Sequence, residues 1–156
     1  MSELTIQLTD APTDEARHVI TEGLDDYNAR QAGYRDWRPL AVLVRSPANG
    51  HVVGGMLGRT SLGLLFIDLV FLPVDARGQR IGTRVLRLAE QEAVRRGCRS
   101  AVLYTISFQA PGFYERHGWR ELGRIPCDPA GASRIVMTKA LTVDRAELVR
   151  EDASNA

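Results

Sequence analysis

Two periodicities of apolar side chains divide the chain into expected strands and helices. Alternation of apolar and polar residues is typical of a half-buried strand, whereas apolar positions three or four residues apart are typical of an amphipathic helix. Leu4, Ile6 and Leu8 show the first pattern, and glycine or proline residues end most segments of either kind. The sequence predicts strands at 4–8, 40–44, 51–57, 64–72, 101–106, 119–125 and 133–141, and helices at 13–30, 81–96 and 111–117.

The order of these segments indicates a single mixed α/β domain, because strands and helices are interspersed along the chain. The turn formers at 47–50 connect two of the expected strands as a hairpin. We expect the domain to cover residues 1–141. The remaining residues, 142–156, are polar and show no apolar periodicity beyond Leu148 and Val149, so we expect a mobile tail there.

Composition and charge restrict the function classes. The chain has 156 residues, of which 44% are hydrophobic and 25% charged, as in an ordinary globular domain rather than a disordered chain. The 20 Lys and Arg residues balance 19 Asp and Glu residues, and the net charge of +1 argues against a dedicated nucleic-acid-binding protein. No apolar run approaches the roughly 20 residues that cross a bilayer, and the N-terminus has no signal-peptide pattern. We therefore expect a cytoplasmic protein without a membrane partner, with Cys98 and Cys127 as free thiols.

A loop rich in glycine and arginine precedes the expected helix at 81–96. The first amides of a helix have no intrahelical partner and carry partial positive charge, which makes them a natural site for an anion such as phosphate. Gly78 and Gly82 leave room for close approach of a ligand to the backbone, and the loop arginines add positive charge. The spacing matches neither a Walker loop nor a dinucleotide fingerprint. By itself the loop fits a phosphate site and a glycine turn with solvated arginines equally well.

Two segments of the sequence resemble the signatures of the GCN5-related N-acetyltransferase (GNAT) superfamily. RGQRIG, at 77–82, is similar to the segment Arg/Gln-x-x-Gly-x-Gly/Ala, which cradles the pyrophosphate of acetyl-CoA in that family. Arg77 and Gly82 match, whereas Arg80 stands where the family usually has glycine. SFQAPGFYERHGW, at 107–119, is similar to the later signature Asn-x-x-Ala-x-x-Phe-Tyr-x-x-x-Gly-Phe. Its matching positions are Ala110, Phe113, Tyr114 and Gly118, with Trp119 in place of the usual aromatic residue and Ser107 in place of asparagine.

This resemblance implies a fold, a reaction and a set of binding residues. The fold would be one mixed sheet, mostly antiparallel, in which two parallel neighbouring strands splay apart. The reaction would be transfer of an acetyl group from acetyl-CoA to a primary amine of a small molecule or peptide, by direct attack in a ternary complex. A homodimer is compatible with the habit of the family. The resemblance assigns acetyl-CoA binding to Val70, Leu72, Arg77, Gly78, Gln79, Arg80, Ile81, Gly82, Thr83, Ser107 and Ala110.

Asp68 and Tyr114 are the candidate catalytic residues. Asp68 interrupts an apolar strand, where a charge is costly without a function, and the matching place in one branch of the family holds a glutamate base. A solvent-facing strand residue, or one neutralised by an arginine, would leave the same pattern. Glu22, Asp25 and Asp26 in the first expected helix are alternative bases. Tyr114 matches a family tyrosine that lies close to the sulfur and could protonate the leaving thiolate, although an aromatic ring packed in the core has the same spacing.

Two other functions are consistent with the sequence. A catalytically silent acyl-CoA-binding module is favoured by the departures at Arg80 and Ser107. The other is a transferase that acts on a protein tail or on a charged tRNA, and the small net charge argues against the tRNA more than against the tail. His18, His51 and His117 show no metal-ligand spacing, so no metal is expected.

Overall fold

The computed structural model describes residues 2–141, so the expected tail at 142–156 lies outside the described part. The chain divides into two compact units, Met1–Asp36 and Trp37–Ala156, and each is taken by itself below. The expectation of one domain over residues 1–141 therefore stays a prediction. Among the described residues, no helix is long and apolar enough to span a membrane.

The first unit consists of an extended N-terminal segment and helix α1 (Asp14–Ala32). Thr13 caps this helix, because its Oγ1 accepts the backbone N–H of Ala16 at 3.1 Å. Gly33 ends the helix in the left-handed conformation, with a φ of 88°. The strand expected at 4–8 does not form, so this prediction is wrong. An alternating pattern becomes a strand only when a neighbouring strand completes its hydrogen-bond ladder, and the pattern alone does not supply that neighbour.

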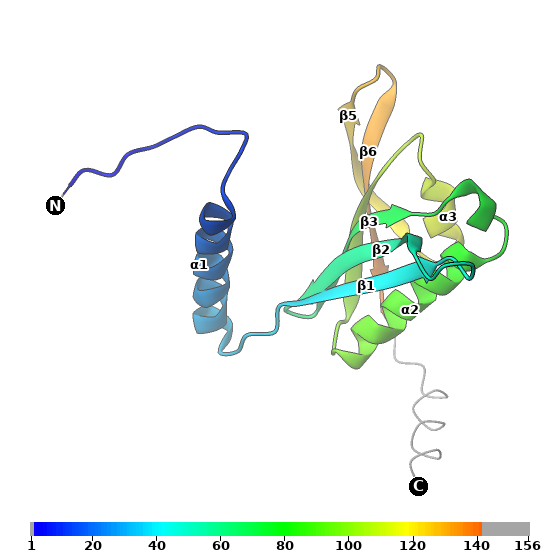
Figure 1. Cartoon of the computed structure of the whole chain (residues 1–156), viewed down its shortest axis with the longest axis horizontal. Helices are drawn as coiled ribbons and strands as arrows, with labels where there is room; N and C mark the ends of the chain where they lie inside the picture. Colours follow the sequence, from blue (N-terminus) through cyan, green and yellow to red (C-terminus); the bar gives the residue numbers. More distant parts are fainter. Residues whose placement is uncertain (1, 142–156) are drawn as a thin grey trace, which may run out of the picture. The chain divides into compact units, whose positions relative to one another are not determined.

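The second unit is a six-stranded sheet in the order β1-β2-β3-β4-β6-β5, with helix α2 against it (Figure 1). Its strands are β1 (Arg38–Arg45), β2 (Val52–Ser61), β3 (Leu64–Phe71), β4 (Ser100–Ile106), β5 (Arg120–Cys127) and β6 (Ala132–Ala140). Its helices are the 3₁₀ turn η1 (Val74–Ala76), α2 (Ile81–Arg95) and α3 (Pro111–Arg116). Every neighbouring pair of strands is antiparallel except β3 and β4, which are parallel. The predicted α/β fold, with a mostly antiparallel mixed sheet, is confirmed.

A tight turn sets the register between β2 and β3. Leu62 and Gly63 connect these strands, and both have positive φ, 49° and 81° respectively. Positive φ at both central residues is typical of a type I′ turn, whose twist matches the twist of the strands that it joins. Glycine adopts this conformation freely. Leu62 adopts it against the preference of an L-residue, because its Cβ comes close to the backbone.

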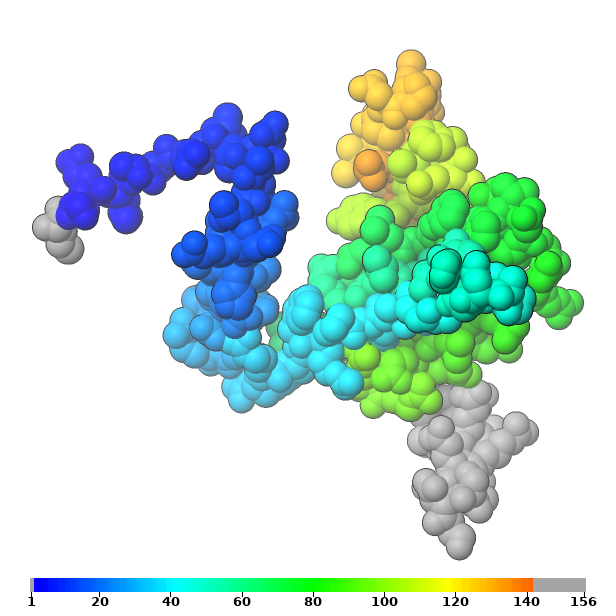
Figure 2. All heavy atoms as spheres, viewed as in Figure 1, coloured from blue at the N-terminus to red at the C-terminus, as the bar shows by residue number. Residues whose placement is uncertain are grey.

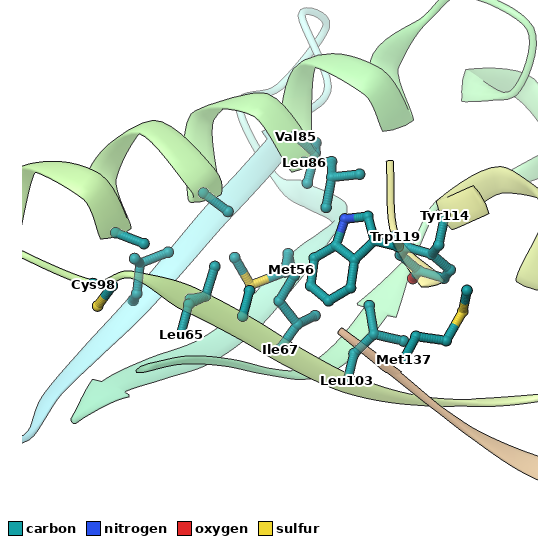
Figure 3. Packing of buried hydrophobic residues seen from close by; sticks show 14 of the residues in the cluster. Met56, Leu65, Ile67, Val85, Leu86, Cys98, Leu103, Tyr114, Trp119 and Met137 are labelled. Carbon is teal, nitrogen blue, oxygen red and sulfur yellow. The ribbon is translucent and has the colours of Figure 1, made fainter. Parts of the chain in front are cut away.

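The core lies between α2 and one face of the sheet (Figure 3). Met56, Leu65 and Met137, from β2, β3 and β6, are its largest fully buried side chains. Burial of such a side chain contributes about 1.5–3 kcal/mol to the stability of the fold. This layer therefore fixes α2 on the sheet, and with it the position of the loop that precedes α2. The side chains that α2 buries are Val85, Leu86, Ala89 and Ala93.

β3 and β4 run side by side only over their first halves. Their pairing joins Leu64–Ile67 to Ser100–Leu103, and beyond it β3 stays paired with β2 and β4 with β6. A bulge in β3 lies at the same place, where the register shifts between Leu57 and Gly58 and makes Asp68 the extra residue. The splay implied by the resemblance is therefore present. It separates the two parallel strands at their carboxyl ends.

Candidate active site

The start of α2 is open to an anion. Arg80, the residue before the helix, makes no side-chain cap, and the first turn contains no acidic residue. α1 differs at both points, because Thr13 caps it and Asp14 and Glu15 lie in its first turn. The first amides of α2 lack intrahelical partners and present partial positive charge. Arg80 and Arg84 add two full positive charges at this end of the helix.

Side-chain bonds within the loop hold the turn that leads into α2. Arg77 donates from Nε to the carbonyl oxygen of Leu72 at 3.3 Å, and Gln79 donates from Nε2 to the carbonyl oxygen of Asp75 at 3.1 Å. Gly78 has a φ of 82° and open space where a Cβ would lie, so its role is conformational. These three predicted binding residues therefore form one preformed turn in front of the helix.

Arg80 has a backbone conformation that glycine prefers. Its φ and ψ are 58° and 18°, in the left-handed region. This region costs an L-residue about 1–2 kcal/mol, and such strain persists only where the surrounding structure holds it. The position at which the sequence departs from the glycine of the family signature is thus a position whose backbone favours glycine. The departure adds a charge and keeps the conformation.

Gly82 lies where α2 and α3 come close together. A Cβ at this position would lie 3.2 Å from Leu72 Cδ1 and 3.2 Å from Phe113 Cζ, shorter than optimal carbon contacts. Leu72 and Ile81 themselves pack against the core. Figure 2 shows the green segment that carries the start of α2 next to the yellow-green segment that carries the end of β4 and the start of α3. Close helix packing is therefore a reason for glycine here, in addition to the ligand approach expected from the sequence.

A side-chain network joins the first turn of α2 to the end of α3. Thr83 Oγ1 lies 3.0 Å from His117 Nε2, and His117 Nδ1 lies 2.7 Å from the carbonyl oxygen of Phe113. The ring centroids of His117 and Phe113 are 4.6 Å apart. No sequence pattern connects Thr83 with His117, because only the fold brings these segments into contact. The network links a predicted diphosphate-binding residue to the helix that carries Tyr114.

Tyr114 packs in the core between two other aromatic residues (Figure 3). Its ring centroid lies 5.2 Å from that of Phe113 and 6.0 Å from that of Trp119, both in edge-on contact. Burial raises the pKa of Tyr114 above the ordinary value of 10.0, because the phenolate would be poorly solvated. The ring is thus a core residue, as one interpretation of the sequence expects. A phenol with a pKa of 10 or above is protonated at neutral pH, as a general acid requires.

Trp119, against which Tyr114 packs, donates a hydrogen bond to a carboxylate that is itself paired with a lysine. Its Nε1 donates to Glu90 Oε1 at 3.1 Å, and Lys139 Nζ lies 3.0 Å from the same oxygen. The side chains of Glu90 and Lys139 are only 16% and 26% exposed, so solvent screens this pair incompletely. One carboxylate on α2 therefore connects β6 with Trp119, the residue that directly precedes β5. No sequence pattern reveals this connection, because its three members lie in separate segments.

Asp68 lies on the face of the sheet opposite α2. Its partner Arg59 pairs with Phe66, and Phe66 stands between the buried Leu65 and Ile67, so it points away from the core with Arg59 beside it. Asp68 Oδ1 accepts a hydrogen bond from Arg59 Nη1 at 2.6 Å, and the Arg59 guanidinium lies 4.1 Å from the ring centroid of Phe66. The alternative of an aspartate satisfied by a neighbouring arginine is thus present. The bulge nevertheless places this carboxylate where β3 and β4 separate.

The other predicted binding residues border the splay. Val70 pairs with Met56 of β2, on the part of β3 that has left β4. Ser107 follows β4 and forms a reciprocal pair with Ser133, because its N–H donates to the Ser133 carbonyl at 2.9 Å and its Oγ accepts the Ser133 N–H at 3.0 Å. Ala110 is the residue before α3.

The alternative bases lie on α1, in the first unit. Arg35 forms an ion pair with Asp26, and its guanidinium lies 3.7 Å from the carboxylate of Glu22. Asp25 is half-buried on the same helix. Because these acids belong to the first unit, their proposed role stays a prediction. Within residues 2–141, no group of three or more side chains could hold a metal ion.

Comparison with known proteins defines the class of this molecule. The sequence profile of the Acetyltransferase (GNAT) family matches residues 6–119. An acetyltransferase of Agrobacterium fabrum is 37% identical over 118 residues, which cover 76% of this chain and 85% of the relative. Blasticidin-S acetyltransferase of Streptomyces morookaense is 34% identical over 115 residues, which cover 72% of this chain and 85% of the relative.

The fold leads to the same class. A crystal structure of an acetyltransferase from Agrobacterium tumefaciens matches with a TM-score of 0.79 at 34% identity, covering 88% of this chain and 99% of the other. The chain belongs to the GNAT family of acetyltransferases. Membership implies use of an acyl-CoA, and the residues present fit that group: free helix amides and arginines suit its diphosphate.

Proposed function

We propose that this enzyme transfers an acetyl group from acetyl-CoA to a primary amine of a small molecule or peptide in a ternary complex. The observation that carries the proposal is the open start of α2 in the same unit as the splay of β3 and β4. A diphosphate suits free amides and arginines, and the narrow pantetheine arm suits a gap between two strands. The proposed catalytic domain comprises residues 1–141.

The donor would be held mainly by backbone groups. Residues 77–83 would bind the diphosphate, as the family signature implies. The amides of Val70 and Leu72 would bind the pantetheine arm and polarise the thioester carbonyl, because β3 has no partner strand on the β4 side there. Ser107 and Ala110 would border the arm from the other side of the splay.

The transfer moves two protons. The amine nitrogen attacks the acetyl carbonyl carbon, the carbon–sulfur bond breaks, and the thiolate leaves. A lysine-like amine has a pKa of about 10.4, so its neutral form costs about 4.6 kcal/mol at pH 7. Asp68, directly or through a water, would accept the amine proton, and a general base contributes about 10²- to 10⁴-fold in rate. Tyr114 would donate its phenolic proton to the sulfur.

The placement of the two candidates supports these separate roles. Tyr114 lies on the core side of the sheet and Asp68 on the opposite face. An acceptor amine and a leaving thiolate that meet in the splay would therefore be served from different sides. A small-molecule acceptor is supported by the relative that is a blasticidin-S acetyltransferase.

Thermal unfolding with and without acetyl-CoA tests the donor. At about 100 times its Kd, acetyl-CoA should stabilise the protein by about 2.7 kcal/mol. For a chain of this size that raises Tm by about 5–10 °C. An unchanged Tm would exclude both the enzyme and a silent acyl-CoA-binding module.

Thiol release from acetyl-CoA with a panel of small amines and peptides tests the reaction. Wild type is compared with Tyr114→Phe, whose fold is checked by its Tm and by its response to acetyl-CoA. A Tm shift without thiol release for any acceptor would favour the silent module. Undiminished turnover in Tyr114→Phe would remove Tyr114 from the role of acid.

A further inference from the structure

The hydrogen bond between Thr83 and His117 has a direction that chemistry fixes. His117 Nδ1 lies 2.7 Å from the carbonyl oxygen of Phe113, which can only accept, so Nδ1 carries a hydrogen. A neutral imidazole then has no hydrogen on Nε2. The Thr83 hydroxyl, 3.0 Å from Nε2, must therefore donate its hydrogen to the ring.

This direction conflicts with anion binding at the start of α2. Thr83 is the third residue of the helix, in the turn whose free amides would face the diphosphate. A hydroxyl has a single hydrogen. While that hydrogen is bonded to His117, the Thr83 oxygen presents only lone pairs, which repel a phosphate oxygen. Protonation of Nε2 reverses the bond, because His117 then donates and the hydrogen of Thr83 is released.

We infer that His117 is a positioning residue for the acyl-CoA diphosphate, because its protonated form turns the Thr83 hydroxyl into a donor to phosphate. This inference rests on the proposed function, which puts the diphosphate at the start of α2. Donor binding then takes up a proton at His117. By linkage, affinity for the donor is highest below the pH at which the imidazole titrates and falls as the pH rises through it.

Histidine is the side chain whose ordinary pKa lies near neutral pH, and the charged residues on the elements around His117 keep their charge there. They are Arg84, Arg87, Glu90, Glu92 and Arg95 in α2, Glu115 and Arg116 in α3, Arg120, Glu121 and Arg124 in β5, Arg134 and Lys139 in β6, and Arg80 directly before α2. Arginine and lysine stay cationic and carboxylates stay anionic between about pH 6 and 8. Glu90, the acid on the Thr83 side of α2, is already bonded to Trp119 and Lys139. Proton uptake in this pH range is therefore expected at the imidazole.

Calorimetric titration of the full chain with coenzyme A measures the uptake directly. The observed enthalpy is recorded at pH 7 in buffers of different ionisation enthalpy, and its slope gives the number of protons bound. The 3′-phosphate of the ligand itself titrates near about pH 6. Each titration is therefore repeated with 3′-dephospho-coenzyme A, whose diphosphate stays ionised. Wild type should take up a fraction of a proton with either ligand.

Three variants locate the proton. His117→Gln keeps a polar group within reach of Thr83 but does not titrate, and it should take up no proton on binding 3′-dephospho-coenzyme A. Thr83→Val keeps the shape of the side chain without the hydroxyl and should also lose the uptake. His51→Gln, in the exposed turn before β2, is the matched control and should behave as wild type.

The dissociation constant gives a second readout. Between pH 6 and pH 8 the Kd of wild type for 3′-dephospho-coenzyme A should rise on the order of fivefold or more, and that of His117→Gln should change little. Equal proton uptake by wild type and His117→Gln would overturn the inference. The proposed function would still stand in that case, because both proteins would have bound coenzyme A. If His117→Gln does not fold, Thr83→Val decides by itself. A proton uptake by Thr83→Val equal to that of wild type would overturn the inference. Failure of wild type to bind at any pH would overturn the proposed function and this inference together.

Discussion

Replacement of Arg80 by glycine should stabilise the fold and weaken donor binding at the same time. Arg80 has a φ of 58° and makes no capping bond through its side chain, so the substitution removes no cap. Release from the left-handed conformation gains about 1–2 kcal/mol. The greater freedom of glycine in the unfolded chain opposes this by about 0.5–1 kcal/mol. The expected net gain is about 0.5–1 kcal/mol, or about 1–4 °C in Tm.

The effect on the donor has the opposite sign. Arg80→Gly removes one positive charge from the start of α2, where the diphosphate would bind. An exposed ion pair contributes about 0.2–1 kcal/mol, so the Kd for coenzyme A should rise by up to about fivefold. The loss should shrink at high ionic strength, because salt screens exposed charges.

Urea unfolding and calorimetric titration separate the two effects when matched variants are included. Leu62→Gly relieves a positive φ of 49° in the turn between β2 and β3, and it should stabilise the protein without changing affinity for coenzyme A. Arg80→Ala loses the charge but keeps the unfavourable conformation, so it should weaken binding without the gain in stability. A neutral or destabilising Arg80→Gly beside a stabilising Leu62→Gly would refute the argument from strain at Arg80.

Three further predictions follow from the packing around α2 and α3. Gly82→Ala should destabilise by about 1–3 kcal/mol in urea unfolding, because its Cβ would lie 3.2 Å from both Leu72 and Phe113. Gly112→Ala in α3, whose Cβ would meet its nearest neighbour at 3.5 Å, is the control and should not show this loss. Glu90→Gln should cost about 1–2 kcal/mol, because it weakens the bonds to Trp119 and Lys139. If the charge pair with Lys139 is the source of this cost, Glu90→Gln should cost nothing further in a protein that already carries Lys139→Met. An equal cost in both backgrounds would contradict that source. Burial raises the pKa of Tyr114, so the neutral phenol stabilises the folded state fully below about pH 10 and this contribution is lost as the pH rises through the folded pKa. Urea unfolding at pH 9 and pH 11 should therefore show wild type losing more stability than Tyr114→Phe, and parallel losses would contradict the raised pKa.

The second unit could be predicted from sequence because each of its elements has an apolar face with a partner nearby. The helix expected at 81–96 is α2, Ile81–Arg95, whose buried positions recur on one side. The strand expected at 64–72 is β3, Leu64–Phe71. Residues 4–8 alternate between apolar and polar like a half-buried strand but do not form one. A strand also needs a neighbouring strand to bond its backbone groups, and that neighbour is a property of the fold.

The candidate site divides in the same way. The loop at 77–82 and Tyr114 can be proposed as site residues from the sequence, because each lies within a short segment that resembles a family signature, and their roles stay predictions. The Arg59 partner of Asp68 and the contacts of Thr83 with His117 and of Glu90 with Trp119 were not predictable. Polar pairs of this kind leave no periodic signal, since each member alone resembles a solvated surface residue.

Arg80 shows how a departure from a signature can preserve geometry. Judged from the sequence, arginine in place of glycine puts the shape of the loop in doubt. The backbone of Arg80 nevertheless stays left-handed, while Arg77 and Gln79 bond within the loop and α2 is fixed by its buried face. These contacts outweigh the about 1–2 kcal/mol of strain at one residue. The conformation of the turn is therefore set by the elements around it, and the substitution changes the charge offered to the diphosphate rather than the path of the chain.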